Sequence, residues 1–254
     1  MTALDFVSDT AVLTGRTLRH VTRSIDTIIT TAIMPIGIML MFVYVFGGAI
    51  DTGDTPYIDY LLPGILLITV ASGVSYTGYR LFMDLKSGIF ERFQSLPIGR
   101  TGVLWAHVLT SLAANLVSLV LVVAVAVLMG FRTGTDVVGW LAVTGILLLF
   151  TLALTWVAVI AGLSANSVEG ASAFSYPLIF LPFVSSAFVP TETMPAPVRW
   201  FAENQPVTSI VNSIRAVFAG QPVGADIWIA LAWCLGILVA AVIAARLVYR
   251  RKLA

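Results

Sequence analysis

Residues 101–130 read TGVLWAHVLTSLAANLVSLVLVVAVAVLMG, and this stretch contains no Asp, Glu, Lys or Arg. A charged side chain at the centre of a bilayer costs about 2.5–3.5 kcal/mol on insertion scales. A helix of about 20 apolar residues is long enough to cross the hydrocarbon core. The stretch is therefore typical of a membrane-spanning helix.

The composition of the whole chain agrees with this interpretation. Of its 254 residues 59% are hydrophobic and only 11% are charged, whereas a soluble domain carries about 25% charged residues. This balance excludes a soluble enzyme, because one core could not bury so much apolar surface. Cys234 is the only cysteine, which excludes a disulfide framework. The net charge of +1 gives no reason to expect a nucleic-acid partner.

Five other long intervals between charged residues repeat the pattern. Each interval is long enough for one helix across a core of about 30 Å, and none is long enough for two. We therefore expect an all-α polytopic membrane protein with six transmembrane helices in a single domain over residues 1–254. The expected spans lie near residues 27–48, 60–79, 102–130, 138–162, 171–189 and 227–247.

Lys and Arg gather in the short loops on the cytoplasmic side of membrane proteins. With six spans, most of the 14 basic residues fall on the side that holds both chain ends, so both termini are expected in the cytoplasm. The opposite side holds only Arg132, Arg199 and Arg215. The first 25 residues include Asp5 and Asp9 and no compact apolar run, so we expect no secretory signal peptide there.

Residues 1–26 have an amphipathic pattern. Apolar side chains recur at helical spacing on one face, and Arg16, Arg19 and Arg23 fall on the other. This pattern predicts an interfacial helix at the membrane surface. The alternative is a flexible tail whose arginines only set the topology.

A second amphipathic segment follows the second expected span, from Arg80 to Arg100. Its apolar side chains form one stripe at helical spacing, and its polar side chains lie opposite. We expect a cytoplasmic helix that ends near Pro97 and Gly99 and docks on a partner. A helix that only rests on lipid would show the same stripe. The stripe comprises Phe82, Leu85, Ile89, Phe93 and Leu96.

A third segment, between the fifth and sixth expected spans, predicts two short helices. The first runs from Ala196 to Glu203, and the second carries apolar residues at three- and four-residue intervals from Val207 to Phe218. We expect an outer helical hairpin that caps the spans, broken at residues 204–206. The alternative is a loop that packs flat on the helix ends.

Residues for catalysis are missing. The two lysines, Lys86 and Lys252, do not follow a glycine-rich loop, so the chain has no phosphate-binding loop of its own. His20 and His107 have no His or Cys neighbours that would complete a metal site. The spans hold no acidic or basic residue in their interiors, which disfavours an ion-coupled transporter. We therefore expect no catalytic, cofactor-binding or metal-binding residues, and either a separate motor or a passive structural role.

Three strings then identify a family. They are YIDYLLPGI at residues 57–65, MDLKSGIFERFQSLPIGR at residues 83–100, and a third match at residues 182–215 that includes ENQPVT. Together they resemble the permease subunits of ABC-2 type exporters, most closely the daunorubicin and multidrug resistance permeases. Family members often have Asn-Pro in the last motif, whereas this chain has Asn204-Gln205-Pro206. The motif positions are Leu62, Pro63, Gly64, Pro97, Met194, Pro195, Asn204, Pro206 and Arg215.

This resemblance implies a permease in the bacterial inner membrane that pairs with a second copy, expected as a homodimer. It implies two separate ATP-binding cassette subunits, which bind the ATP and Mg²⁺, so this chain itself is not an enzyme. It also implies that the helix after the second span is the coupling helix and that the hairpin closes the outer side. The coupling-helix residues are Phe82, Asp84, Leu85, Gly88, Ile89, Glu91, Arg92 and Phe93.

The expected cargo is an amphipathic drug-like or lipid-like molecule moved out of the cytoplasm, as in multidrug efflux and antibiotic resistance. Aromatic residues in the first and fifth spans suit such a cargo, although aromatic residues in spans more often serve helix packing. Export of polysaccharide or lipo-oligosaccharide is the alternative within the family, and a non-transporting membrane scaffold or assembly protein is the alternative outside it. The substrate-binding residues remain unassigned. The aromatic residues in question are Phe42, Tyr44, Phe46, Tyr176, Phe180 and Phe183.

Overall fold

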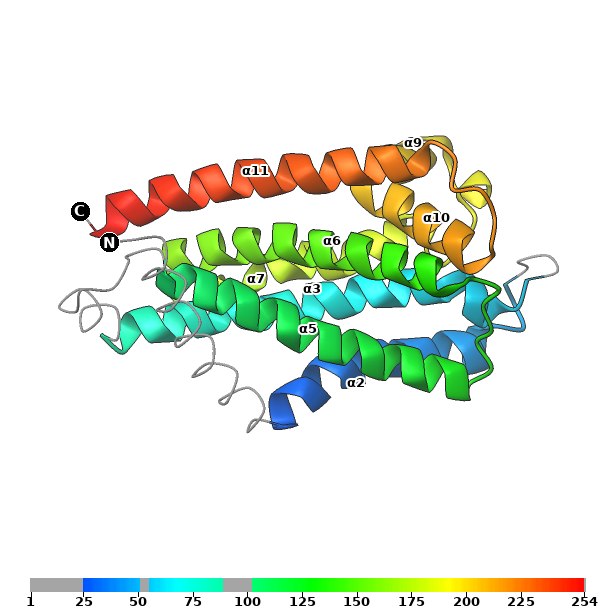
Figure 1. Ribbon diagram of the computed structural model, residues 1–254, viewed down its shortest axis with the longest axis horizontal. Helices are drawn as coiled ribbons and strands as arrows, with labels where there is room; N and C mark the ends of the chain where they lie inside the picture. The colour runs from blue at the N-terminus through cyan, green and yellow to red at the C-terminus, as the bar shows by residue number, and fades with distance from the viewer. Residues whose placement is uncertain (1–24, 51–54, 89–101, 254) are drawn as a thin grey trace.

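The computed structural model describes residues 25–50, 55–88 and 102–253, and within these ranges every regular element is a helix. Four long helices lie side by side along the molecule (Figure 1). All four are long and apolar enough to cross a membrane. They are α3 (Tyr57–Lys86), α5 (Gly102–Leu128), α6 (Val137–Ser164) and α11 (Asp226–Leu253).

Two further apolar segments are not among these four long α-helices. The helix α2 (Ile25–Met41) continues as the π-helix η1 (Phe42–Phe46), in the region of the first expected span. In the described residues the structure therefore bears out four long spans, and the count of six stays a prediction. The expected interfacial helix at residues 1–26 falls almost wholly outside the described residues.

The fifth expected span, at residues 171–189, is not one continuous helix, which corrects the prediction. It is divided into α7 (Val168–Ala173), α8 (Ser175–Phe180) and the 3₁₀-helix η2 (Leu181–Val184). Pro177 and Pro182 explain the breaks, because a proline cannot donate the helical hydrogen bond to the residue four positions earlier.

The helix α3 is the central element. In its most apolar window 72% of the residues are buried, against 17% in the corresponding window of α11. It packs against α2, α5, α6 and α10, the last of which spans Pro206–Phe218. With 30 residues it is about 45 Å long at 1.5 Å per residue, so it runs through the whole bundle.

Glycines allow α3 to approach its neighbours closely. A Cβ built on Gly162 of α6 would lie 2.7 Å from the carbonyl oxygen of Gly78 in α3. A Cβ built on Gly78 would lie 2.7 Å from the carbonyl oxygen of Ala171 in α7. Such contacts between backbones are typical of helix packing in membranes, where small residues line the interfaces.

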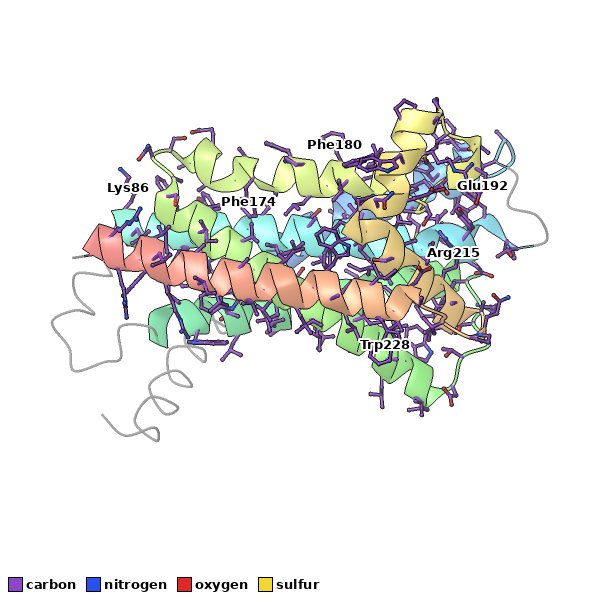
Figure 2. All side chains as sticks on the ribbon, turned by 90° about the horizontal axis from the view of Figure 1, so that it is seen from above. Lys86, Phe174, Phe180, Glu192, Arg215 and Trp228 are labelled. Carbon is purple, nitrogen blue, oxygen red and sulfur yellow. The ribbon has the colours of Figure 1, made fainter. Side chains whose placement is uncertain are left out.

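The bundle has two different ends. At the end where α3 begins, which we call the cap end, lie the 3₁₀-helix η3 (Thr191–Thr193), α9 (Ala196–Asn204) and α10 (Figure 1). At the other end, which we call the Lys86 end, α3 and α11 finish and α5 begins. Figure 2 shows Arg215 and Glu192 far from Lys86 along the long axis.

Candidate functional site

At the Lys86 end the predicted coupling helix does not begin as a separate element. The helix α3 is continuous from the second span through Lys86, so Phe82, Asp84 and Leu85 stand on its last turns. Gly88 then has φ of +72°, a left-handed conformation that commonly follows the end of a helix and that glycine adopts without strain. The prediction of one separate helix from Arg80 to Leu96 is therefore wrong at its start, because residues 80–86 belong to α3.

The rest of the predicted coupling segment lies outside the described residues. Its residues there are Ile89, Glu91, Arg92, Phe93 and the motif residue Pro97. The described structure shows only that α3 ends at Lys86, shortly before this segment in the chain. Its role in docking therefore stays a prediction.

The last turns of α3 are held against α5. The Asp84 carboxylate lies 3.1 Å from Nε2 of His107 in α5, which is buried. Phe82 is buried and Leu85 is partly buried among apolar side chains. Asp84 therefore fastens the end of α3 to α5, a role that the amphipathic pattern does not predict, and His107 is a partner of this carboxylate.

At the cap end, Arg215 of α10 is the centre of a polar cluster. Its guanidinium lies 3.8 Å from the centroid of the Tyr60 ring of α3. Nη2 donates to the carbonyl oxygens of Tyr60, at 3.0 Å, and Ser186, at 2.7 Å, and Nε donates to the same Tyr60 oxygen at 3.2 Å. Nη1 donates to Oδ1 of Asn212 at 3.2 Å, and Ser186 Oγ donates to that oxygen at 2.7 Å. We call Tyr60, Ser186, Asn212 and Arg215 the cap cluster.

The charge of Arg215 is satisfied mainly by carbonyl groups. Burial lowers the pKa of Arg215, but a guanidinium stays protonated in proteins. Among the described residues no carboxylate pairs with it. Hydrogen bonds to a charged donor are stronger than neutral ones. The cluster thus joins the start of α3, the segment after η2, and α10. In sequence, Tyr60 lies 155 residues and Ser186 lies 29 residues before Arg215.

The motif residues Pro63 and Gly64 lie beside this cluster. A Cβ built on Gly64 would lie 2.6 Å from Cβ of Ala187, so glycine is needed for the close approach of the two segments. About two helical turns before Gly64, Tyr57 Oη donates to the carbonyl oxygen of Phe188 at 3.2 Å. Pro63 lies within α3 and provides no helical hydrogen bond. The string around Tyr57 and Gly64 therefore forms the surface on which residues 185–188 pack.

Gln205 forms the corner between α9 and α10. Its Nε2 donates to the carbonyl oxygens of Val184 at 2.9 Å and Leu181 at 3.4 Å, which attaches the corner to η2. Pro206 is the first residue of α10, and Nδ2 of Asn204 donates to the Trp200 carbonyl oxygen at 2.8 Å. Gln205, which separates Asn204 from Pro206, thus has hydrogen-bond acceptors in η2.

The remaining motif positions mark helix boundaries or buried packing. Met194 and Pro195 lie between η3 and α9, and Leu62 is fully buried in α3. The predicted break between two short helices at residues 204–206 agrees with the structure.

The sequence analysis did not single out four residues at the cap end, which are Tyr57, Tyr60, Ser186 and Asn212. The two tyrosines lie inside the quoted string at residues 57–65, so this string was an available signal.

Polar side chains form a directional hydrogen-bond chain in the middle of the bundle. Thr77 Oγ1 of α3 donates to Ser111 Oγ of α5 at 2.9 Å. Thr155 Oγ1 of α6 lies 3.1 Å from the same serine and donates its own proton to the Thr151 carbonyl oxygen at 2.7 Å. Because each hydroxyl has one proton, Ser111 donates to Thr155. Three helices are joined without any ionised group.

The aromatic residues of the first and fifth expected spans fall into two groups. Phe42 and Phe183 each have their ring centroids 4.8 Å from that of Phe188, so they pack together. Tyr44, Phe46, Tyr176 and Phe180 are exposed on the surface of the chain. Among the described residues no group of His, Cys, Asp or Glu could hold a metal ion.

Comparison with known proteins places these features in a family. The family described as "ABC-2 type transporter" matches residues 8–219. The chain is 28% identical over 229 residues to the daunorubicin resistance ABC transporter permease protein DrrB1 of Streptomyces coeruleorubidus, covering 89% of this chain and 80% of that protein. It is 26% identical over 251 residues to the probable doxorubicin resistance ABC transporter permease protein DrrC of Mycobacterium tuberculosis, covering 97% of this chain and 90% of that protein.

Proposed function

The chain belongs to the ABC-2 type transporter family, and on that premise we propose that it is the permease subunit of an ATP-driven exporter that moves an amphipathic drug-like or lipid-like molecule out of the cytoplasm. The observation that carries this proposal is the family match over residues 8–219. The relatives are permease proteins of drug resistance transporters, which supports the class of cargo.

The energy comes from a separate ATP-binding cassette subunit. The chain has only two lysines, and neither follows a glycine-rich loop, so it has no phosphate-binding loop. We propose that the ATPase binds the segment that starts after Gly88, including Glu91, Arg92 and Phe93. This segment follows the end of α3 directly in the chain, so a force on it acts on that helix.

We propose that α3 transmits this force to the cap end. It is one continuous helix, held to α5 by Asp84 and His107 at one end and bonded to Arg215 at the other. A packed helix moves as a rigid element, so a displacement at one end shifts the groups at its other end. The cap cluster would then open and close the outer exit as α3 moves.

The proposed orientation puts the Lys86 end in the cytoplasm and the cap end outside, in the bacterial inner membrane. The distribution of Lys and Arg supports it. Among the described residues the cap end carries Arg132, Arg199 and Arg215, and the Lys86 end carries Arg80, Lys86, Arg246, Arg250 and Arg251. We further propose that two copies of the chain form the translocation path as a homodimer.

The test uses the chain together with an ATP-binding cassette subunit that co-purifies with it. Inside-out membrane vesicles that contain both subunits are expected to accumulate daunorubicin when ATP is added. The matched control carries a partner ATPase whose phosphate-loop lysine is changed to alanine, and it should accumulate none. Accumulation that depends on a proton gradient and not on ATP would overturn the proposal. Failure of any ATPase to co-purify with the chain would favour a scaffold protein instead.

A further inference from the structure

A cavity of about 240 Å³ opens at the Lys86 end between α5, α6 and α11. It is larger than the roughly 150 Å³ cavity that holds a benzene molecule in an engineered protein core. Its lining combines two indole rings with two guanidinium groups. The lining residues are Leu104, Trp105, Trp156, Arg246, Tyr249 and Arg250.

The two arginines carry positive charge that the described residues do not neutralise. Arg246 and Arg250 are one helical turn apart on α11 and both are exposed. The ion pairs in the described part of the chain join Asp84 to His107 and Arg199 to Glu203, and neither includes these arginines. An anion that enters the cavity therefore meets two available guanidinium groups, which bind phosphate oxygens with parallel hydrogen bonds.

Two indole rings form an apolar wall of the cavity. Trp156 of α6 is only 3% exposed, and its ring contacts Trp105 edge to face, with centroids 5.3 Å apart. Its Nε1 has no hydrogen-bond partner among the described residues and is closed off from a water-sized molecule, so it does not face the cavity. The polar groups that a ligand in the cavity can reach are therefore those of the arginines and Tyr249.

The surface beside the cavity is apolar. Val239, Ile243 and Leu247 of α11 are all more than half exposed and lie one turn apart along the helix. Acyl chains can lie along this ridge while the arginines bind a head group. Tryptophan and arginine at the end of a transmembrane helix are typical of the head-group region, and basic pockets between helices bind anionic lipid head groups.

We propose that this cavity binds the phosphate of an anionic phospholipid, with Arg246 and Arg250 as the recognition groups. This site differs from the cap cluster and from the segment proposed to bind the ATPase, and it does not depend on the cargo. The shared chemistry is a phosphate group, so a free phosphate ion is the competing source that the experiment must separate.

The experiment measures binding to the purified full chain in zwitterionic detergent micelles. Three probes are titrated in parallel: phosphatidylglycerol, phosphatidylcholine with the same acyl chains, and inorganic phosphate. Bound lipid is counted by native mass spectrometry, and the unfolding midpoint is followed for each probe. We expect phosphatidylglycerol to bind at least tenfold more tightly than phosphatidylcholine, and inorganic phosphate to give no shift at matched concentration.

The variants test the recognition groups. Arg246→Gln and Arg250→Gln should each weaken phosphatidylglycerol binding about fivefold. Trp156→Phe, which keeps an aromatic wall and removes a donor that does not face the cavity, should change binding less than twofold. The matched control is Arg251→Gln, an exposed arginine on the same helix that does not line the cavity, and it should change binding less than twofold.

Several results would overturn the proposal. Equal binding of the two lipids, or equal losses in Arg251→Gln and Arg250→Gln, would show general attraction to the protein surface. An inorganic phosphate shift as large as that of phosphatidylglycerol would assign the cavity to a free anion. Both arginines are exposed, so their variants should unfold at the wild-type midpoint without lipid, and this keeps the test valid even if Trp156→Phe unfolds.

Discussion

Replacing Arg215 by alanine should both destabilise the protein and uncouple export. The change removes four hydrogen bonds from the guanidinium and the contact with the Tyr60 ring. A hydrogen bond to a charged group contributes about 1.5–3 kcal/mol, and a desolvated cation–π contact contributes about 2 kcal/mol. These terms are not additive, because the four bonds share one side chain and three acceptors. The net loss should therefore be about 3–5 kcal/mol, the range found when one partner of a buried charge cluster is removed.

Two measurements are needed for this variant. Unfolding in mixed micelles with increasing SDS gives the change in the free energy of unfolding, and vesicle accumulation of daunorubicin with the partner ATPase gives transport. Arg215→Lys is the informative companion, because lysine keeps the charge but cannot contact Tyr60 and Ser186 with a planar fork. We expect it to recover less than half of the lost stability.

The matched control is Arg199→Ala on α9. Arg199 is exposed and bonds only to Glu203, four residues along the same helix, at 2.7 Å. Its loss should leave both stability and transport unchanged within error. If Arg215→Ala unfolds like wild type, or if Arg215→Lys restores everything, then the fork geometry of the cap cluster does not matter and the reasoning fails.

Three other predictions address separate features. Gly64→Ala should lower the free energy of unfolding by about 1–3 kcal/mol, because its new Cβ meets Ala187. Gly145→Ala, whose Cβ meets nothing within 4 Å, should raise it by about 0.5–1 kcal/mol. If SDS unfolding shows that both variants change the free energy in the same direction, the steric argument is refuted. Glu91→Lys should weaken co-purification of the ATPase at least tenfold while the recovery of permease from membranes stays constant; unchanged co-purification would mean that this segment only rests on lipid. A cysteine at Thr193 should react with a membrane-impermeant maleimide in intact spheroplasts, and labelling only after lysis would reverse the proposed orientation.

The fold was predictable where hydropathy decides it. The intervals without charge located all four long helices, because burying a charge in lipid is costly at any position along a span. Hydropathy does not detect how a helix is interrupted. Residues 171–189 are as apolar as a span, yet Pro177 and Pro182 divide them, and the interval rule takes no account of backbone donors.

The start of the coupling segment shows a related difficulty. The stripe that includes Phe82 and Leu85 continues at helical spacing beyond Lys86, so periodicity alone suggests one helix that begins at Arg80. The structure joins its first turns to α3, and the left-handed Gly88 ends that helix. A glycine in the middle of an amphipathic pattern was the available sign of a helix end.

The cap cluster could be predicted only in part. Arg215 was expected as a motif position from the family resemblance, but its acceptors lie on residues that are distant in sequence and on backbone atoms. No periodicity links Tyr60 to Arg215, because tertiary packing brings them together. The sequence therefore indicated the arginine of the cluster, and only the folded chain shows which groups accept its hydrogen bonds.

The choice of acceptors in this cluster has an evolutionary consequence. Arg215 donates most of its hydrogen bonds to main-chain oxygens, and every amino acid has such an oxygen. Mutation at Ser186 therefore keeps the main-chain acceptor of Arg215 and removes only the hydroxyl that donates to Oδ1 of Asn212, so selection for the contact with Arg215 acts on the course of the backbone there. Homologues should tolerate drift at this position while the arginine stays fixed. Carbonyl oxygens also do not titrate near neutral pH, so an acidified exterior would leave these bonds intact.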